Sequence, residues 1–158
     1  MFGTKFVVSN LKNIDLIINN IKSKLIDEFY LEKGNNNIKL IVKNDLVNLG
    51  FMFYGCKTLY NIDELKYLKT NFCTDFCYMF LGCSSLSDIK SLENWNVSNG
   101  TNFHNMFNYC SSLSDITSLK KWDVSNSIDF NSMFKNCKLL SDIKSLANWD
   151  ISKGTLFS

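Results

Sequence analysis

The chain is dominated by an apolar pattern that returns every 27 residues. From Met52 onward, a Met-Phe pair is followed by Cys, Leu, Ile and Leu at fixed spacing, without an insertion. The cysteine column shows the interval: Cys56, Cys83, Cys110 and Cys137. A unit this short cannot bury its own apolar side chains, so neighbouring units must cover one another. The sequence therefore predicts stacked coils with identical side chains in file, such as Met79, Met106 and Met133.

Each unit is expected to contain one strand and one short helix. The Leu86–Ile89 spacing favours a short strand entering a turn, and stacked copies would form a parallel sheet. Phe103, Met106, Phe107 and Cys110 follow the i, i+3, i+4, i+7 spacing of one helix face. Asn, Ser and Gly between these segments predict turns.

The repeat resembles that of the BspA-like leucine-rich repeat family. The resemblance rests on M-F-x-x-C-x-S-L-x-x-I at residues 79–89 and on N-W-x-V-S-N at residues 94–99, and it covers residues 51–158. It implies a leucine-rich-repeat solenoid used in adhesion or protein–protein contacts, with no catalytic residues to transfer. The expected fold class is thus α/β, a solenoid of about four units with short parallel strands and short helices, the C-terminal unit being truncated.

Residues 1–50 depart from the period and are expected to form an N-terminal α/β cap. Residues 15–18 and 39–42 are strand-like, and Asn19-Asn20 suits a hairpin turn. Residues 22–29 fit a helix or a strand, and both remain open. Residues 34–37 are expected to form a loop.

The other end of the array lacks a polar capping unit. Ser158 follows Phe157 directly, whereas a fifth Met-Phe pair would begin at residue 160. Three explanations stay open: the natural protein continues, the chain is a fragment, or a partner covers the last coil. An exposed edge of this kind also favours homotypic end-to-end stacking.

The cysteine column is interpreted as structural, because side chains of one column project in parallel and buried Cys behaves as a small hydrophobe. Cys73, Cys77 and His104 lie outside that column and form an alternative metal or redox site. With only three candidate ligands and no C-x-x-C spacing, no metal or cofactor is predicted. Asp88, Asp115 and Asp142 form a second column, which is interpreted as capping turns through backbone N–H groups.

Two sets of columns are the candidate binding residues. The tryptophans either close the core with the indole N–H on a carbonyl, or form an exposed row that binds a partner. The serines are expected to face solvent as a flat polar surface. The candidates are Trp95, Trp122, Trp149, Ser87, Ser91, Ser114, Ser118, Ser141 and Ser145.

Composition narrows the partners. All 17 basic residues are Lys and the net charge is +2, so the arginine fork that grips phosphate and guanine is missing and no nucleic-acid partner is expected. No run approaches the about 18 apolar residues of a membrane span, and no signal peptide is visible. The compartment stays open: cytoplasmic if the chain is complete, cell surface by the family resemblance.

The sequence contains no G-x-S-x-G, P-loop or G-x-G-x-x-G motif, and it has one His. We therefore predict a protein that is not an enzyme. Its expected function is a protein–protein interaction or adhesion scaffold that presents a rigid repeated surface to a protein partner. The alternatives are a self-assembling structural unit that uses the uncapped C-terminal coil, and the metal or redox site named above.

Overall fold

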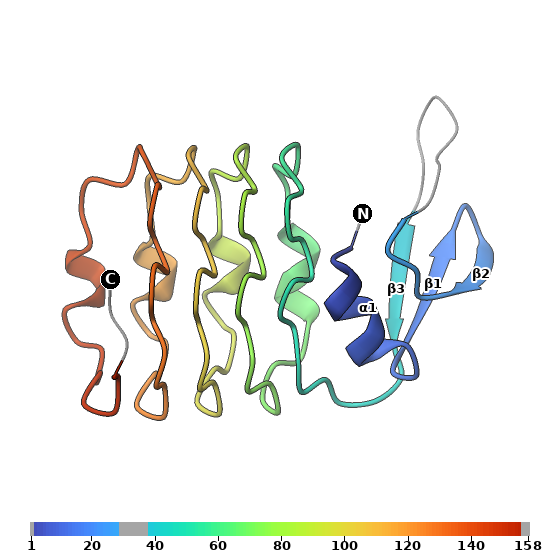
Figure 1. Cartoon of the computed structure of the whole chain (residues 1–158), viewed down its shortest axis with the longest axis horizontal. Coiled ribbons are helices and arrows are strands. Elements are labelled where there is room, and N and C mark those ends of the chain that lie inside the picture. Colours follow the sequence, from blue (N-terminus) through green and yellow to red (C-terminus); the bar gives the residue numbers. More distant parts are fainter. Residues whose placement is uncertain (1, 29–37, 156–158) are drawn as a thin grey trace.

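A computed structural model describes residues 2–28 and 38–155 (Figure 1). The N-terminal part holds helix α1 (Thr4–Asn10) and strands β1 (Ile14–Ile18), β2 (Ile21–Lys24) and β3 (Ile38–Val42). The strands form one antiparallel sheet in the order β2-β1-β3. Leu16 of β1 is fully buried and pairs with Ser23 of β2 and Leu40 of β3.

The predicted strands at residues 15–18 and 39–42 are confirmed as parts of β1 and β3. The predicted Asn19-Asn20 turn is confirmed as well, since both residues take the left-handed backbone conformation, with φ of 50° and 68°. The open segment 22–29 contributes to β2, and the predicted loop at 34–37 lies outside the described residues. Helix α1 is a feature that the sequence did not reveal.

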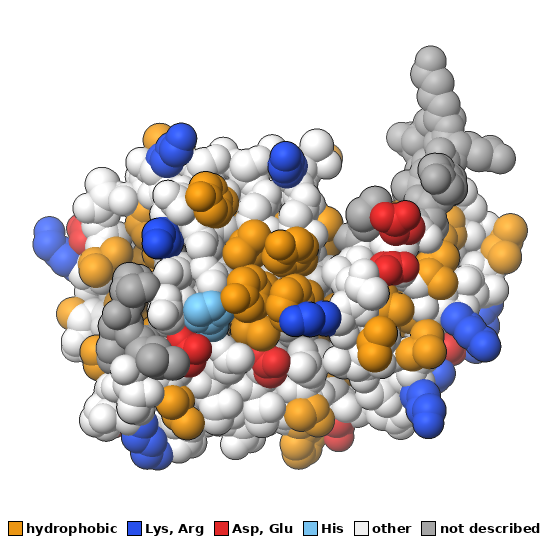
Figure 2. Space-filling view, in the orientation of Figure 1, with side chains coloured by type: hydrophobic (Ala, Val, Ile, Leu, Met, Phe, Trp, Pro, Cys, Tyr) orange, Lys and Arg blue, Asp and Glu red, His pale blue; other side chains and the backbone are white. Residues whose placement is uncertain are grey.

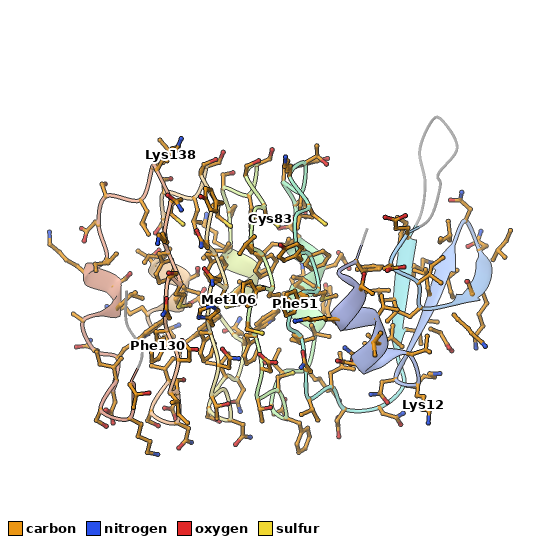
Figure 3. All side chains as sticks on the ribbon, viewed as in Figure 1. Lys12, Phe51, Cys83, Met106, Phe130 and Lys138 are labelled. Carbon is orange, nitrogen blue, oxygen red and sulfur yellow. The ribbon has the colours of Figure 1, made fainter. Side chains whose placement is uncertain are left out.

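From Leu46 onward the chain runs in successive coils that lie side by side (Figure 1). Side chains 27 residues apart are neighbours: the rings of Phe80 and Phe107 stack with centroids 5.5 Å apart, and Phe107 and Phe134 with centroids 5.7 Å apart. Met79 and Met106 are fully buried in the same core. The repeat columns are therefore packed in file along the long axis of the molecule (Figure 3).

A row of backbone hydrogen bonds links neighbouring coils along one side of the stack. The N–H of Phe51 donates to the Cys77 carbonyl at 2.9 Å, and that of Tyr78 to the His104 carbonyl at 2.8 Å. The N–H of Asn105 continues the row to the Asn131 carbonyl. These bonds fix the register of neighbouring coils, so a one-residue slip would break the whole row.

The predicted fold class is wrong. Within residues 2–28 and 38–155, the strands are antiparallel and end at Val42, and the parallel pairing in the coils is limited to isolated bridges such as Asp75↔Asn102. The coils carry only short 3₁₀ turns: η1 (Asp63–Tyr67), η2 (Lys90–Leu92), η3 (Thr117–Leu119) and η4 (Lys144–Leu146). The structure is thus a small antiparallel sheet with one helix beside stacked irregular coils, and not a leucine-rich-repeat solenoid with parallel strands.

Left-handed backbone positions interrupt the segments of the coils that were predicted to be helical, whereas the predicted strand at residues 86–89 runs into the turn capped by Asp88. Each unit carries two residues of positive φ, and neither an extended strand nor an α-helix tolerates that conformation. In the segment predicted to be helical, Asn105 (φ 56°) and Tyr109 (φ 61°) interrupt the helix. The full set is Phe51, Tyr78, Asn105 and Ser132 in one column, and Gly55, Gly82, Tyr109 and Asn136 in the other.

Asn and Asp side chains build the corners of the coils. Asp88 Oδ1 accepts the backbone N–H of Lys90 at 2.8 Å, and Asp115 and Asp142 do the same two residues on, which confirms the predicted turn-capping. A second column, unnoticed in the sequence, runs through Asn48, Asp75, Asn102 and Asp129. These side chains satisfy backbone donors that a sheet would otherwise pair.

Helix α1 covers the first coil. The Gly3 N–H donates to the Phe51 carbonyl at 3.1 Å, and Asn10 Nδ2 donates to the Asn48 carbonyl at 2.9 Å. Phe6 of α1 is fully buried in the common core. Among the described residues, no helix has the length and apolar character needed to cross a membrane.

Candidate functional site

The tryptophan column faces the core. The Nε1–H of Trp95 donates to the Leu65 carbonyl at 2.9 Å, and that of Trp122 to the Leu92 carbonyl at 3.0 Å. Neighbouring indoles stack with centroids 6.4 Å apart and planes 3° from parallel. Trp95 and Trp122 are buried and Trp149 is half-buried, so this column offers a partner little surface.

The serine columns do not form one flat surface. Ser87, Ser114 and Ser141 are exposed, whereas Ser91 and Ser145 are half-buried in 3₁₀ turns. Ser118 is buried, with 9% of its surface exposed. Only the first column therefore lies where a partner could touch it.

The cysteine column is structural, as predicted. The Sγ–H groups of Cys83, Cys110 and Cys137 each donate to a carbonyl of the preceding coil, and no disulfide joins these three cysteines. Burial raises the pKa of Cys83 to about 12 and that of Cys137 to about 11. Thiols that stay protonated are poor nucleophiles and poor metal ligands.

Cys73, Cys77 and His104, the residues of the alternative metal or redox site, make other contacts. The Cys73 Sγ–H donates to the Leu46 carbonyl at 3.1 Å, and burial raises the pKa of both Cys73 and Cys77 to about 12. His104 Nδ1 lies 3.5 Å from Asp129 Oδ1. Within residues 2–28 and 38–155, no group of three or more His, Cys, Asp or Glu side chains is placed to hold a metal ion.

The structure reveals a surface that the sequence did not suggest. Phe51, Tyr54, Tyr78 and His104 form a continuous cluster of rings, here called the ring cluster. The centroids of Phe51 and Tyr78 are 4.7 Å apart, with the planes 18° from parallel, and Tyr78 meets His104 edge to face at 5.0 Å. Tyr54 joins through Phe51 at 5.6 Å and is 48% exposed. Figure 2 shows apolar side chains gathered at the middle of this face, beside the histidine.

The ring cluster occupies strained backbone. Phe51 and Tyr78 hold φ of 63° and 57°, a region that bulky residues rarely adopt and that costs about 1–3 kcal/mol per residue. In the third and fourth coils the same column is filled by Asn105 and Ser132, small polar residues, of which Asn adopts this conformation readily. The fold thus requires a left-handed residue here but does not require an aromatic one.

Charged side chains border the ring cluster. A shallow hollow of about 420 Å³ is lined by Phe51, Asp75, Lys5, Val8 and Cys77, among others. The Lys5 ammonium sits 4.6 Å from the centroid of the Phe51 ring. A carboxylate, an ammonium group and partly exposed aromatic rings therefore lie together on one face.

A second, larger groove separates β3 from the first coil. It has a volume of about 1120 Å³, and its lining is mainly apolar, with Ile41, Met52 and Leu65 among its residues. Figure 2 shows the hollow between the coils and the sheet. None of the apolar side chains that line this groove belongs to a residue with a positive φ, in contrast to those of Phe51 and Tyr78 in the ring cluster.

A signal for the ring cluster existed in the sequence. Gly55, Gly82 and Asn136 share a column, and Gly with Asn at one position indicates a left-handed turn. That signal marks one column only. The other left-handed column begins with Phe51 and Tyr78, and aromatic residues do not indicate a left-handed backbone.

Comparison with known proteins yields one family. The family model described as "Mycoplasma protein of unknown function, DUF285" matches residues 26–158. No curated protein and no solved structure matches the chain.

Proposed function

We propose that the chain, which belongs to the DUF285 family, is a non-enzymatic scaffold that binds another protein through the ring cluster. The observation that carries the proposal is the placement of the half-buried Phe51 and Tyr78 in left-handed backbone. Strain of this kind persists where function offsets its cost in stability. Partly exposed aromatic side chains are also enriched where proteins bind one another.

Rigid display supports the same proposal. The ring cluster draws on three successive coils, and its Phe51 packs against the buried core. A partner therefore meets rings that are already ordered, which lowers the entropy cost of binding. The thiols are buried and protonated, and the sequence contains none of the three catalytic motifs considered above. Neither observation supports an enzymatic alternative.

Photo-crosslinking tests the proposal. Tyr54, at 48% exposure, is replaced with benzoylphenylalanine in the full chain, which is then illuminated in a mycoplasma lysate. The matched control carries the same replacement at Tyr60, which is 75% exposed and lies outside the ring cluster. We expect discrete protein adducts at Tyr54, and we expect Phe51→Asn with Tyr78→Asn to remove them.

Equal adducts at Tyr54 and Tyr60 would contradict the proposal, as would adducts at Tyr54 that survive the double substitution. The double variant remains a fair test because Asn105 shows that Asn fills this column. Circular dichroism and the urea midpoint establish that the variant is folded before it is compared.

A second candidate function is self-assembly through the last described coil. Ile89 and Ile116 are 1% exposed, whereas Ile143 in the same column is 60% exposed. Uncovered apolar surface of this kind favours association with a second copy. Light scattering after size exclusion tests it: a dimer that Ile143→Lys dissociates would support self-assembly, and a monomer at high concentration would contradict it.

A further inference from the structure

The charges around the ring cluster point to the chemistry of its partner. Asp75 lines the hollow beside Phe51, and Asp129 lies next to His104 at the other end of the ring cluster. Asp75 Oδ2 accepts the amide of Asn48 and Asp129 accepts the N–H of Asn131. In the described part of the chain, no lysine forms an ion pair with either carboxylate.

One cation of the chain itself already touches the ring cluster. Lys5 places its ammonium over the face of Phe51, on an exposed side chain of α1. The geometry shows that this aromatic surface accepts a cation. One ammonium against two carboxylates leaves the face with an excess of negative charge.

We propose that this face binds a segment of a partner protein that carries Lys or Arg side chains among apolar ones. The basic groups meet the Asp75 and Asp129 carboxylates, and the apolar groups pack on the rings of Phe51, Tyr54 and Tyr78. This inference rests on the proposed function and adds the chemistry of the partner. Complementary charge increases the association rate and disfavours acidic competitors.

The repeat supplies conservative variants for the test. Asn48 and Asn102 stand in the same column as Asp75 and Asp129 and make the same turn bond through Oδ1. Asp75→Asn and Asp129→Asn therefore remove charge and keep the turn. Asp115→Asn is the matched control, because Asn61 fills that column and makes its turn bond.

Binding of three fluorescein-labelled pentapeptides to the full chain is measured by anisotropy at low ionic strength. The peptides are Lys-Trp-Lys-Leu-Lys, Ser-Trp-Ser-Leu-Ser and Glu-Trp-Glu-Leu-Glu. We expect the basic peptide to bind at least fivefold more tightly than the neutral one, with the acidic peptide the weakest. Tyr78→Asn is expected to weaken the basic peptide at least fivefold, and added salt should weaken it as well.

The charge variants test whether the face prefers the basic or the acidic peptide. Asp75→Asn with Asp129→Asn should weaken the basic peptide about threefold to tenfold, and Asp115→Asn should leave it within twofold. Lys5→Met removes the competing ammonium and should strengthen the binding of the basic peptide. If the acidic peptide binds best and Lys5→Met weakens it, the partner is acidic and the inference is overturned.

Failure of the inference is distinguishable from failure of the proposed function. Crosslinks at Tyr54 that depend on the ring cluster would support the scaffold function. If the basic peptide were then not preferred, the inference of a basic partner would be wrong while the proposed function would remain supported. Absence of binding by all three peptides at millimolar concentration would likewise count against a basic segment.

Discussion

Phe51 and Tyr78 stack ring on ring across two coils, with centroids 4.7 Å apart, and both hold left-handed backbone. The stack therefore combines a favourable aromatic contact with an unfavourable backbone at each residue. In the next two coils, Asn105 and Ser132 occupy the same column without rings. The pair is a local choice of the first two coils, and its effects on stability and on binding can be separated by substitution.

Tyr78→Asn should leave stability nearly unchanged. The loss of an aromatic pair costs about 0.5–1.5 kcal/mol, whereas relief of left-handed strain returns about 1–3 kcal/mol. We expect the free energy of unfolding in urea to change by no more than about 1 kcal/mol. Phe80→Ala is the contrasting control, since Phe80 is fully buried and its loss should cost about 3–5 kcal/mol. Equal destabilisation by the two changes would mean that Tyr78 is a core residue.

Trp122→Phe should destabilise the stack. It removes the N–H that donates to the Leu92 carbonyl at 3.0 Å and leaves space among buried rings. A decrease of about 1–2 kcal/mol in the free energy of unfolding is expected. Trp149→Phe removes the equivalent bond to Leu119, but Trp149 is half-buried, so water can replace part of the loss. A larger effect at Trp149 than at Trp122 would be inconsistent with this packing.

Acid should weaken the coils through their turn carboxylates. Hydrogen bonds from the backbone and side chain of Thr117 lower the pKa of Asp115, and those from Ser125 and Ser152 lower the pKa of Asp123 and Asp150. A folded-state pKa below the unfolded value of about 3.9 stabilises the fold above that pH, and this contribution is lost as the pH falls through the folded pKa. The urea midpoint is therefore expected to decline below about pH 4.

The Asn variants provide the control for that pH dependence. Asn61 and Asn96 already make the same turn bonds in other coils. Replacing Asp115, Asp123 and Asp150 with Asn should flatten the decline in acid and leave the midpoint at pH 7 nearly unchanged. An unaltered acid decline in the triple variant would show that other groups govern it.

The thiol column should resist alkylation in the folded protein. Because burial raises the pKa of Cys83 to about 12, its thiol stays protonated at pH 8. Cys56 is half-buried and should be labelled by iodoacetamide before Cys83 and Cys110, as followed by mass spectrometry. In 8 M urea all should react alike. Rapid labelling of Cys110 in the native protein would contradict its burial.

The sequence was sufficient to align the coils but not to give their backbone. The columns of Met79, Phe80 and Cys83 are apolar in every unit, so their burial follows from spacing alone. The predicted helix failed because Asn105 and Tyr109 take left-handed φ, and the predicted strand at residues 86–89 failed because Asp88 caps a turn there. The hydrophobic period indicates which side chains face the core, but it does not indicate the backbone conformation of the residues between them.

The abundance of Asn also had a structural meaning that composition concealed. Asn48 and Asn102 alternate with Asp75 and Asp129 in one turn column, so that carboxylates are separated by amides along the stack. Adjacent carboxylates would repel one another at this spacing. The ring cluster was missed for a different reason: it joins residues of separate coils whose proximity depends on a backbone conformation that the sequence did not show.

The most direct test of the stacked coils is a set of nuclear Overhauser contacts in the isotopically labelled full chain. Contacts are predicted between the rings of Phe80 and Phe107, and between those of Trp95 and Trp122, which lie in adjacent coils. None is predicted between Phe80 and Phe134, two coils apart. Contacts that ignore the 27-residue step, or their absence between Trp95 and Trp122, would contradict the stack on which the binding face depends.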